Sequence, residues 1–98
     1  MVLRVGFEWD LVKDEINKEK HGVTFTEATE VFERVSLTAP DRRFPYGEER
    51  WITIGSNHSG TVLVIAHTRR GSKIRIISAR RANKKERQTL YAKIKPFL

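Results

Sequence analysis

Residues 61–81 read TVLVIAHTRRGSKIRIISARR, two runs rich in β-branched residues that are separated by a short turn at Arg69–Ser72. Such runs are typical of strands, and so short a connection makes neighbouring strands antiparallel. Residues 49–56 alternate in the same way, and a turn at Asn57–Gly60 separates them from the next run. The sequence therefore predicts a three-stranded antiparallel meander over residues 49–81.

The first third of the chain predicts one strand and two helices. Residues 3–9 alternate well enough for a strand, and Asp10 is a suitable cap for a helix over residues 11–21. Thr24, with Glu27 three residues later, forms a capping box, which predicts a second helix ending near residue 34.

The remaining segments complete an α+β pattern. Residues 36–48 contain proline and glycine and predict an extended segment followed by a loop. Asn83 and Glu86 predict the start of a final helix that Pro96 ends. We expect a single α+β domain over residues 1–98, with the helices packed on an antiparallel sheet.

Two-residue turns would distribute the strand residues over two faces, and a slip of one residue would exchange those faces. We expect the two N-terminal helices to cover the more apolar face, which leaves a half-basic face for one helix and for a phosphate backbone. The covered face would carry Arg50, Ile52, Ile54, Leu63, Ile65, His67, Ile74, Ile76, Ser78 and Arg80. The other face would carry Trp51, Thr53, Val64, Ala66, Thr68, Lys73, Arg75, Ile77 and Arg81.

Positive charge is concentrated in the last third of the chain. Residues 69–95 carry eleven basic side chains against Glu86 alone, a net charge of +10, whereas residues 1–68 carry −3. Such a distribution favours a polyanionic partner, and the planar guanidinium group of arginine suits phosphate. A solvated face that only aids solubility is the alternative interpretation.

The composition excludes several classes of protein. Cysteine is absent, so disulfides, thiolate metal sites and a thiol nucleophile are ruled out. The longest purely apolar run, Val62–Ala66, is far shorter than the ~20 residues of a membrane span. The histidines, His21, His58 and His67, are scattered, so we expect no metal and no cofactor. We expect a cytoplasmic protein without membrane contact.

Short motifs in a fixed order run through residues 5–92: Phe7–Asp10, Lys20–Phe25 with Glu27-Ala28, Gly47–Arg50, Ile54-Gly55, Ile74–Arg80, and Glu86-Arg87 with Tyr91. Together they resemble the BrnT family, the ribonuclease toxins of bacterial type II toxin–antitoxin modules. The resemblance implies a RelE-like fold and an RNA-cleaving toxin that halts translation. It also implies a BrnA-type antitoxin as the partner, with DNA contacted only through that antitoxin.

Metal-independent RNA cleavage fits such a basic chain. The ribose 2′-hydroxyl attacks its own phosphate and expels the 5′-oxygen, which needs a base, cations beside the phosphorane and an acid for the leaving oxygen. His67 is the candidate acid or base, because the pKa of an unperturbed histidine is ~6.5. A structural histidine bonded to the turn is the alternative.

Three further residues are candidates for catalysis. Arg75 and Arg80 are candidates for phosphate contacts, with an ion pair to an N-terminal helix carboxylate as the alternative for Arg80. Tyr91 is expected to share a helix face with Arg87, where it can stack on a base, donate a proton or simply pack. The candidate RNA-binding residues are Arg69, Arg70, Lys73, Arg81, Lys84 and Arg87.

The loop before the meander offers further candidates. Glu49 would serve as a base if the loop folded over the groove, and Phe44 and Tyr46 would stack on a base if they were exposed. Two other functions remain open at this point: a non-catalytic nucleic-acid-binding module, and a protein whose basic face binds an acidic partner chain.

Overall fold

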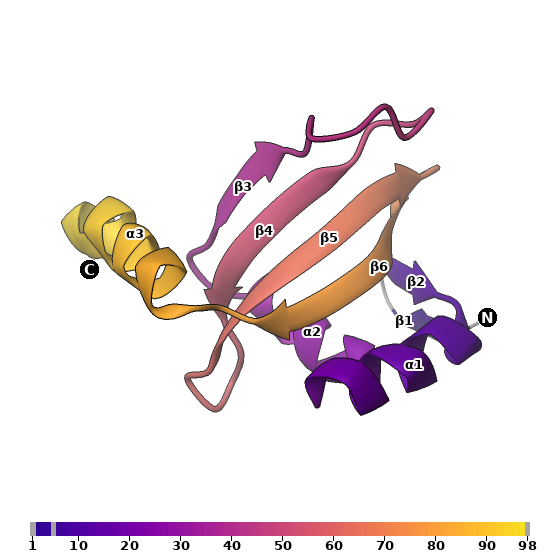
Figure 1. Ribbon diagram of the computed structural model, residues 1–98, viewed down its shortest axis with the longest axis horizontal. Helices are drawn as coiled ribbons and strands as arrows, with labels where there is room; N and C mark the ends of the chain where they lie inside the picture. Colours follow the sequence, from indigo (N-terminus) through magenta and orange to yellow (C-terminus); the bar gives the residue numbers. More distant parts are fainter. Residues whose placement is uncertain (1, 5, 98) are drawn as a thin grey trace.

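In the computed structural model, which describes residues 2–4 and 6–97, three helices flank one sheet of six strands (Figure 1). The strands lie in the order β1-β2-β6-β5-β4-β3, and all neighbours are antiparallel except β2 and β6. The α+β class and the meander of β4, β5 and β6 are thus confirmed. The elements are β1 (Val2–Arg4), β2 (Phe7–Trp9), α1 (Leu11–His21), α2 (Phe25–Val31), β3 (Leu37–Pro40), β4 (Trp51–Ser56), β5 (Val62–Arg70), β6 (Lys73–Arg81), α3 (Lys84–Ile94) and a 3₁₀ turn (Lys95–Phe97).

The N-terminal segment differs from the prediction of one strand over residues 3–9. It forms a hairpin of β1 and β2, with Gly6 at a φ of 81° between them. Glycine adopts this left-handed conformation without steric cost, so the chain reverses there although the alternation of side chains continues. β2 then pairs in parallel with β6, which makes the sheet mixed.

The predicted helix starts are confirmed. Asp10 accepts hydrogen bonds from the backbone N–H groups of Val12 and Lys13, and these bonds lower the pKa of its carboxyl group. The expected capping boxes begin α2 and α3. The second helix ends at Val31, earlier than the expected residue 34, and a turn follows it.

Buried hydrogen bonds fix α1 to the sheet. The amide of Asn17 donates to the carbonyl groups of Val23 (2.9 Å) and Ala79 (2.7 Å), and it accepts from the N–H of Ala79 (3.1 Å). Asp14 accepts from the N–H of Phe25 at 2.9 Å. These bonds join α1, the start of α2 and β6 into one unit.

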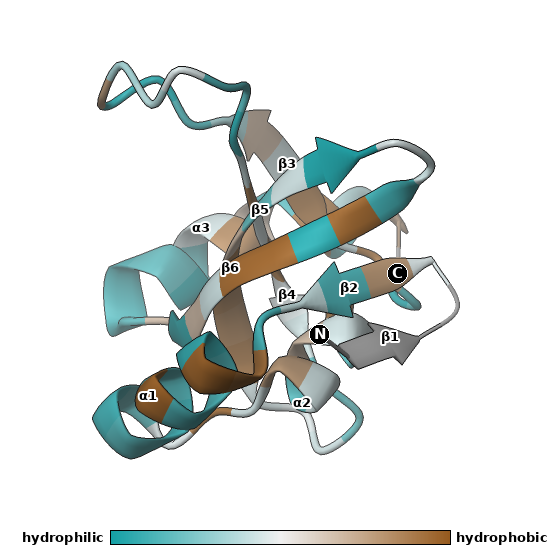
Figure 2. Ribbon diagram, turned by 90° about the vertical axis from the view of Figure 1, so that its right-hand side faces the viewer, coloured by the Kyte–Doolittle hydropathy of each residue, from teal (hydrophilic) through white to brown (hydrophobic). Residues whose placement is uncertain are grey.

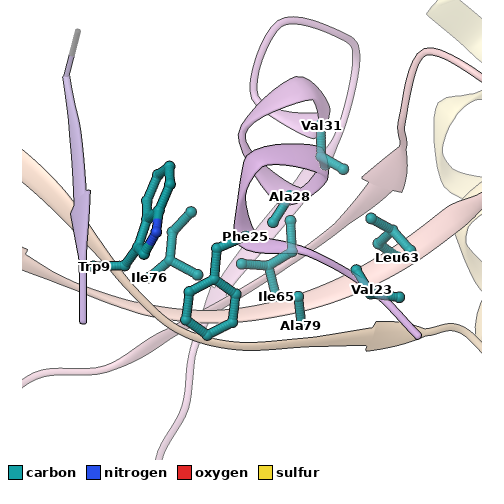
Figure 3. Close-up of a cluster of buried hydrophobic side chains, with 9 residues drawn as sticks. All are labelled: Trp9, Val23, Phe25, Ala28, Val31, Leu63, Ile65, Ile76 and Ala79. Carbon is teal, nitrogen blue, oxygen red and sulfur yellow. The ribbon is translucent and has the colours of Figure 1, made fainter. Parts of the chain in front are cut away.

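Two apolar clusters pack on the two faces of the sheet. Trp9 and Phe25 are 1% and 0% exposed and meet edge to face under α1 and α2. On the other face, Leu90 and Ile94 of α3 pack on Val62 and its neighbours. Figure 3 shows the first cluster, which comprises Trp9, Val23, Phe25, Ala28, Val31, Leu63, Ile65, Ile76 and Ala79.

The register of β4 differs from the prediction by one residue. Trp51 pairs with His67, so the odd-numbered residues of β4 lie on the α1/α2 face. Ile52 and Ile54, expected on that face, instead pack toward α3. The cause is the turn at residues 57–61, which is one residue longer than expected and which the Asn57 side chain closes through hydrogen bonds.

A bulge in β6 also changes the faces. Consecutive residues of β5 pair with Ser78 and Ile76, so Ile77 is an extra residue in the ladder. Ile76 therefore lies on the same face as His67, whereas Ser78 and Arg80 lie on the opposite face, contrary to the prediction. Figure 2 shows the hydrophobic and hydrophilic bands that alternate along β6. Within residues 2–4 and 6–97, the helices are too short and too polar for a membrane span.

Gly55 of β4 leaves no room for a side chain against the end of α2. A Cβ atom there would lie 2.8 Å from Cγ1 of Val31 and 2.9 Å from Cβ of Ser36. We predict that Gly55→Ala lowers the free energy of unfolding by about 1–3 kcal/mol, because the helix must shift to admit a methyl group. Urea denaturation measures this, with Ser56→Ala on the opposite face as the control, and equal stability of both variants would contradict the close contact.

Candidate active site

A hollow of about 510 Å³ opens on the α1/α2 face of the sheet, beside Phe32 at the end of α2. Most of its lining residues come from the end of β5, the start of β6 and the loop between β3 and β4. Figure 1 shows that this loop and the β5–β6 turn lie at the same end of the sheet. Its lining combines carboxylates, an imidazole, a guanidinium group and a large aromatic ring. The polar and aromatic lining residues are Thr38, Glu48, Glu49, Trp51, His67, Thr68 and Arg69.

His67 lies where the core meets this hollow. It is only 6% exposed, and its ring meets the Phe32 ring edge to face at 5.1 Å. Burial, together with the nearby charge of Arg69, lowers the pKa of His67 to about 4, so the imidazole is neutral at pH 7. Nε2 lies 2.7 Å from Oγ1 of Thr53, and among the described residues Nδ1 has no hydrogen-bond partner. Nδ1 is therefore the ring nitrogen left for proton transfer.

The loop before β4 brings carboxylates to the same hollow. Thr68 donates a hydrogen bond of 2.6 Å to the backbone carbonyl group of Glu49, which fastens the loop to β5. Glu48 contacts Arg50 (3.3 Å) and Arg70 (3.6 Å). Within the described residues the carboxylate of Glu49 has no ion pair, and Glu49 lines the same hollow as His67.

The same loop is ordered around one buried carboxylate. Asp41 accepts hydrogen bonds from Nε and Nη2 of Arg43 (2.8 and 2.9 Å) and from the hydroxyl of Tyr46 (2.9 Å). The Arg43 guanidinium holds the pKa of Asp41 well below its usual range. Arg50 stacks over the Tyr46 ring at 4.2 Å, which leaves Phe44, 63% exposed, as the solvent-facing aromatic ring of the loop.

The predicted cations of the β5–β6 hairpin lie on both faces of the sheet. Arg69 lines the hollow, and Arg70 reaches its rim through Glu48. Lys73 and Arg75 belong to the opposite face, because they pair with Arg70 and Thr68 across the hairpin. Nη1 of Arg75 lies 3.6 Å from a carboxylate oxygen of Glu8, and both side chains are largely buried.

Another group of predicted residues surrounds the start of α3. Arg80 donates two hydrogen bonds of 2.8 Å to Glu86, which also accepts from the N–H of Asn83. This pairing lowers the pKa of Glu86 to about 2 and fixes α3 to the end of β6. Arg80 thus forms an ion pair, but the expected partner, a carboxylate of an N-terminal helix, is wrong, because Glu86 of α3 accepts both hydrogen bonds. Arg81 and Lys84 are exposed, and Tyr91 is 51% exposed. The guanidinium group of Arg87 donates a hydrogen bond of 2.9 Å to the carbonyl group of Ala82.

The predicted residues do not converge on one centre. β6 spans about 26 Å between Lys73 and Arg81, at about 3.3 Å per residue. His67 pairs with Ile76, which is four residues, or about 13 Å, along β6 from Arg80, and the side chains of His67 and Arg80 lie on opposite faces of the sheet. Tyr91 belongs to α3, which packs on the face opposite to His67 (Figure 1). The expectation that all these side chains surround one phosphate is wrong, because the length of the strand and the bulge at Ile77 separate them.

Two residues of the site, Thr38 and Thr53, were not predicted from the sequence. Thr53 is 0% exposed and stands between two isoleucines in an apolar strand. A buried hydroxyl group requires a hydrogen-bond partner, and this requirement was the available signal. No cluster of three metal-ligating side chains occurs within the described ranges 2–4 and 6–97.

The low pKa of His67 predicts a dependence of stability on pH. The pKa is about 4 in the folded chain and about 6.5 in the unfolded chain, so the unfolded chain binds the proton first as the pH falls. The contribution of His67 to the free energy of unfolding is therefore complete above about pH 6.5 and is lost between about pH 6.5 and 4. In urea denaturation, His67→Gln should show a shallower loss across this window than the wild type. His21→Gln controls for the loss of an imidazole, and an equal decline in wild type and His67→Gln would contradict the assignment.

Comparisons with known proteins identify the family. The model of the family described as "Ribonuclease toxin, BrnT, of type II toxin-antitoxin system" matches residues 9–86. The crystal structure of the Brucella abortus ribonuclease toxin BrnT shares the fold, with a TM-score of 0.63 and 22% identity over 80% of this chain and 96% of that one. A comparison with curated proteins found no match. Because the family model spans most of the chain, this protein belongs to the BrnT family of ribonuclease toxins of type II toxin–antitoxin systems.

Proposed function

We propose that this BrnT-family ribonuclease is a metal-independent endoribonuclease whose reaction centre is the hollow around His67. The 2′-oxygen of the ribose attacks the adjacent phosphorus, and the bond from phosphorus to the 5′-oxygen breaks. The products are a 2′,3′-cyclic phosphate and a 5′-hydroxyl. The observation that carries the proposal is a neutral imidazole with Nδ1 unoccupied, which shares one hollow with the Glu49 carboxylate and the Arg69 guanidinium.

His67 and Arg69 meet two of the three needs of the reaction, the base and the cation beside the phosphorane. Neutral His67 takes the proton of the 2′-hydroxyl, since an unprotonated imidazole is the form that acts as a base. Arg69 stabilises the negative charge that develops on the phosphorane oxygens. When the phosphate binds, its negative charge raises the pKa of His67 from about 4 toward neutrality and improves the imidazole as a proton acceptor.

The remaining basic residues serve RNA binding instead of the chemical step. Contacts to phosphates away from the cleaved bond contribute affinity that depends on salt, and they carry no sequence information. Arg70 holds the RNA at the rim of the hollow, and Lys73 and Arg75 extend this track on the opposite face. The cluster beside α3 binds a more distant part of the strand, with Tyr91 as a stacking partner; its basic members are Arg80, Arg81, Lys84 and Arg87.

The cellular role follows from the family and from the charge. Cleavage of mRNA in the cytoplasm stops translation, and a BrnA-like antitoxin prevents it. Residues 69–95 carry a net charge of +10, so an acidic segment of the antitoxin is the complementary partner. DNA is contacted only by the antitoxin half of the complex.

We predict that the purified chain cleaves RNA in the presence of EDTA. Mass spectrometry of a short oligonucleotide should find 2′,3′-cyclic phosphate ends, and a 2′-deoxy substitution at the mapped cleavage site should abolish the products. A strict need for Mg²⁺, or cleavage of the deoxy substrate, would rule out the mechanism. RNA binding without any product would instead favour the alternative of a non-catalytic binding module.

We also predict that variants on the two faces of the sheet affect different kinetic constants. His67→Ala should lower kcat by roughly 10²–10⁴-fold, the usual contribution of an acid or base. Arg80→Ala should mainly raise KM and reduce its salt dependence, because it removes a phosphate contact outside the hollow. Lys18→Ala, which removes one positive charge from α1, is the control. A large fall in kcat for Arg80→Ala in a folded protein would place Arg80 at the reaction centre.

A further inference from the structure

Three side chains from neighbouring strands form a continuous chain of hydrogen bonds that begins and ends at the hollow. Oγ1 of Thr38 lies 2.7 Å from Oγ1 of Thr53, which lies 2.7 Å from Nε2 of His67. The antiparallel pairing of β3 with β4 sets Thr38 opposite Thr53. Thr38 and His67 both line the hollow, whereas Thr53 between them is 0% exposed.

We propose that Thr38 and Thr53 are a hydroxyl relay that carries a proton from Nε2 of His67 back to the hollow, where the leaving 5′-oxygen receives it. This inference rests on the proposed function, because it assigns two further residues to the same reaction centre. It makes one histidine sufficient for both proton transfers of the cleavage.

The geometry allows two consistent directions for the hydrogen bonds. Either Nε2–H donates to Thr53 and Thr53 donates to Thr38, or Thr38 donates to Thr53 and Thr53 donates to an unprotonated Nε2. In both directions the hydroxyl of Thr53 donates once and accepts once. A change from the first direction to the second moves one proton from the imidazole to the Thr38 end.

The relay gives a balanced reaction. The proton of the 2′-hydroxyl passes to Nδ1 of His67 while the 2′-oxygen forms its bond to phosphorus. The proton on Nε2 passes to Thr53, the hydroxyl proton of Thr53 passes to Thr38, and that of Thr38 passes to the 5′-oxygen as it leaves with the electron pair of its bond to phosphorus. His67 ends as its other neutral tautomer, and proton exchange with water in the hollow restores the first.

Burial is the physical reason that a relay benefits this site. A histidine that only accepted a proton would become an imidazolium ion among Phe32 and other largely buried side chains, where a charge is poorly solvated. A histidine that accepts on one nitrogen and donates from the other remains neutral throughout. Desolvation opposes the imidazolium form of His67. It does not oppose the relay, because the imidazole is neutral before and after the proton transfers.

The experiment compares hydroxyl-free and hydroxyl-retaining variants of the full chain on a cleaved RNA oligonucleotide. Thr38→Val and Thr53→Val remove the hydroxyl with little change of shape, Thr38→Ser and Thr53→Ser keep it, and Thr61→Val in the β4–β5 turn is the matched control. We expect each relay Val variant to lower kcat at least about tenfold with KM unchanged, and each Ser variant to stay within about threefold of wild type. Circular dichroism and urea denaturation confirm that Thr38→Val, at an exposed position, is folded.

A solvent isotope readout separates a relay from a structural role. In mixtures of H₂O and D₂O, kcat of the wild type should depend on the deuterium fraction with a curvature that indicates several moving protons, and Thr38→Val should lose this curvature. Wild-type kcat and curvature in Thr38→Val would overturn the relay while His67→Ala still tests the proposed centre. If His67→Ala cleaves as fast as wild type, the proposed centre itself fails, whatever the threonine variants show.

Discussion

The pairing of β5 with β6, with its extra residue at Ile77, is the constraint on which the arrangement of the functional groups depends. It keeps Ile76 in the core beneath α1 and α2. It also turns Arg80 to the opposite face, where the guanidinium group donates hydrogen bonds to Glu86. A regular ladder would place Arg80 and His67 on one face, and α3 would begin from the wrong side of the sheet. One additional residue in a strand thus decides which side chains share a surface.

Buried polar contacts then position the elements that the apolar core only brings together. Apolar packing has no direction, whereas the hydrogen bonds of Asn17 define where α1 lies along β6. On the same face, the end of α2 at Val31 leaves the sheet uncovered beyond Phe32. The hollow exists because the helices stop there, and at its boundary Thr38, Thr53 and Nε2 of His67 are joined by hydrogen bonds.

The distribution of charge separates binding from chemistry. A net charge of +7 suits a polyanionic substrate, yet Arg75 and Arg80 are each placed beside a carboxylate, and Glu48 engages Arg70. The reaction centre that we propose instead uses a neutral imidazole in a partly dry site. Desolvation of the imidazole has a cost in the free energy of folding. It also places Nδ1 in surroundings of low dielectric constant, where nearby charges have strong effects. The ribonuclease family to which the chain belongs is consistent with this division.

The sequence by itself determined the α+β class, the meander and the three helix starts, because capping boxes, turns and side-chain periodicity are local signals. The family followed separately, from the resemblance of short motifs in a fixed order. The tertiary structure alone decided that residues 3–9 form a hairpin, that β4 is shifted by one residue and that β6 bulges at Ile77. It alone placed Thr38 and Thr53 beside His67 and separated Arg80 from it. Registers arise from turn lengths and from the packing of distant segments, and a shift of one residue, which barely alters any local pattern, moves every side chain to the other face.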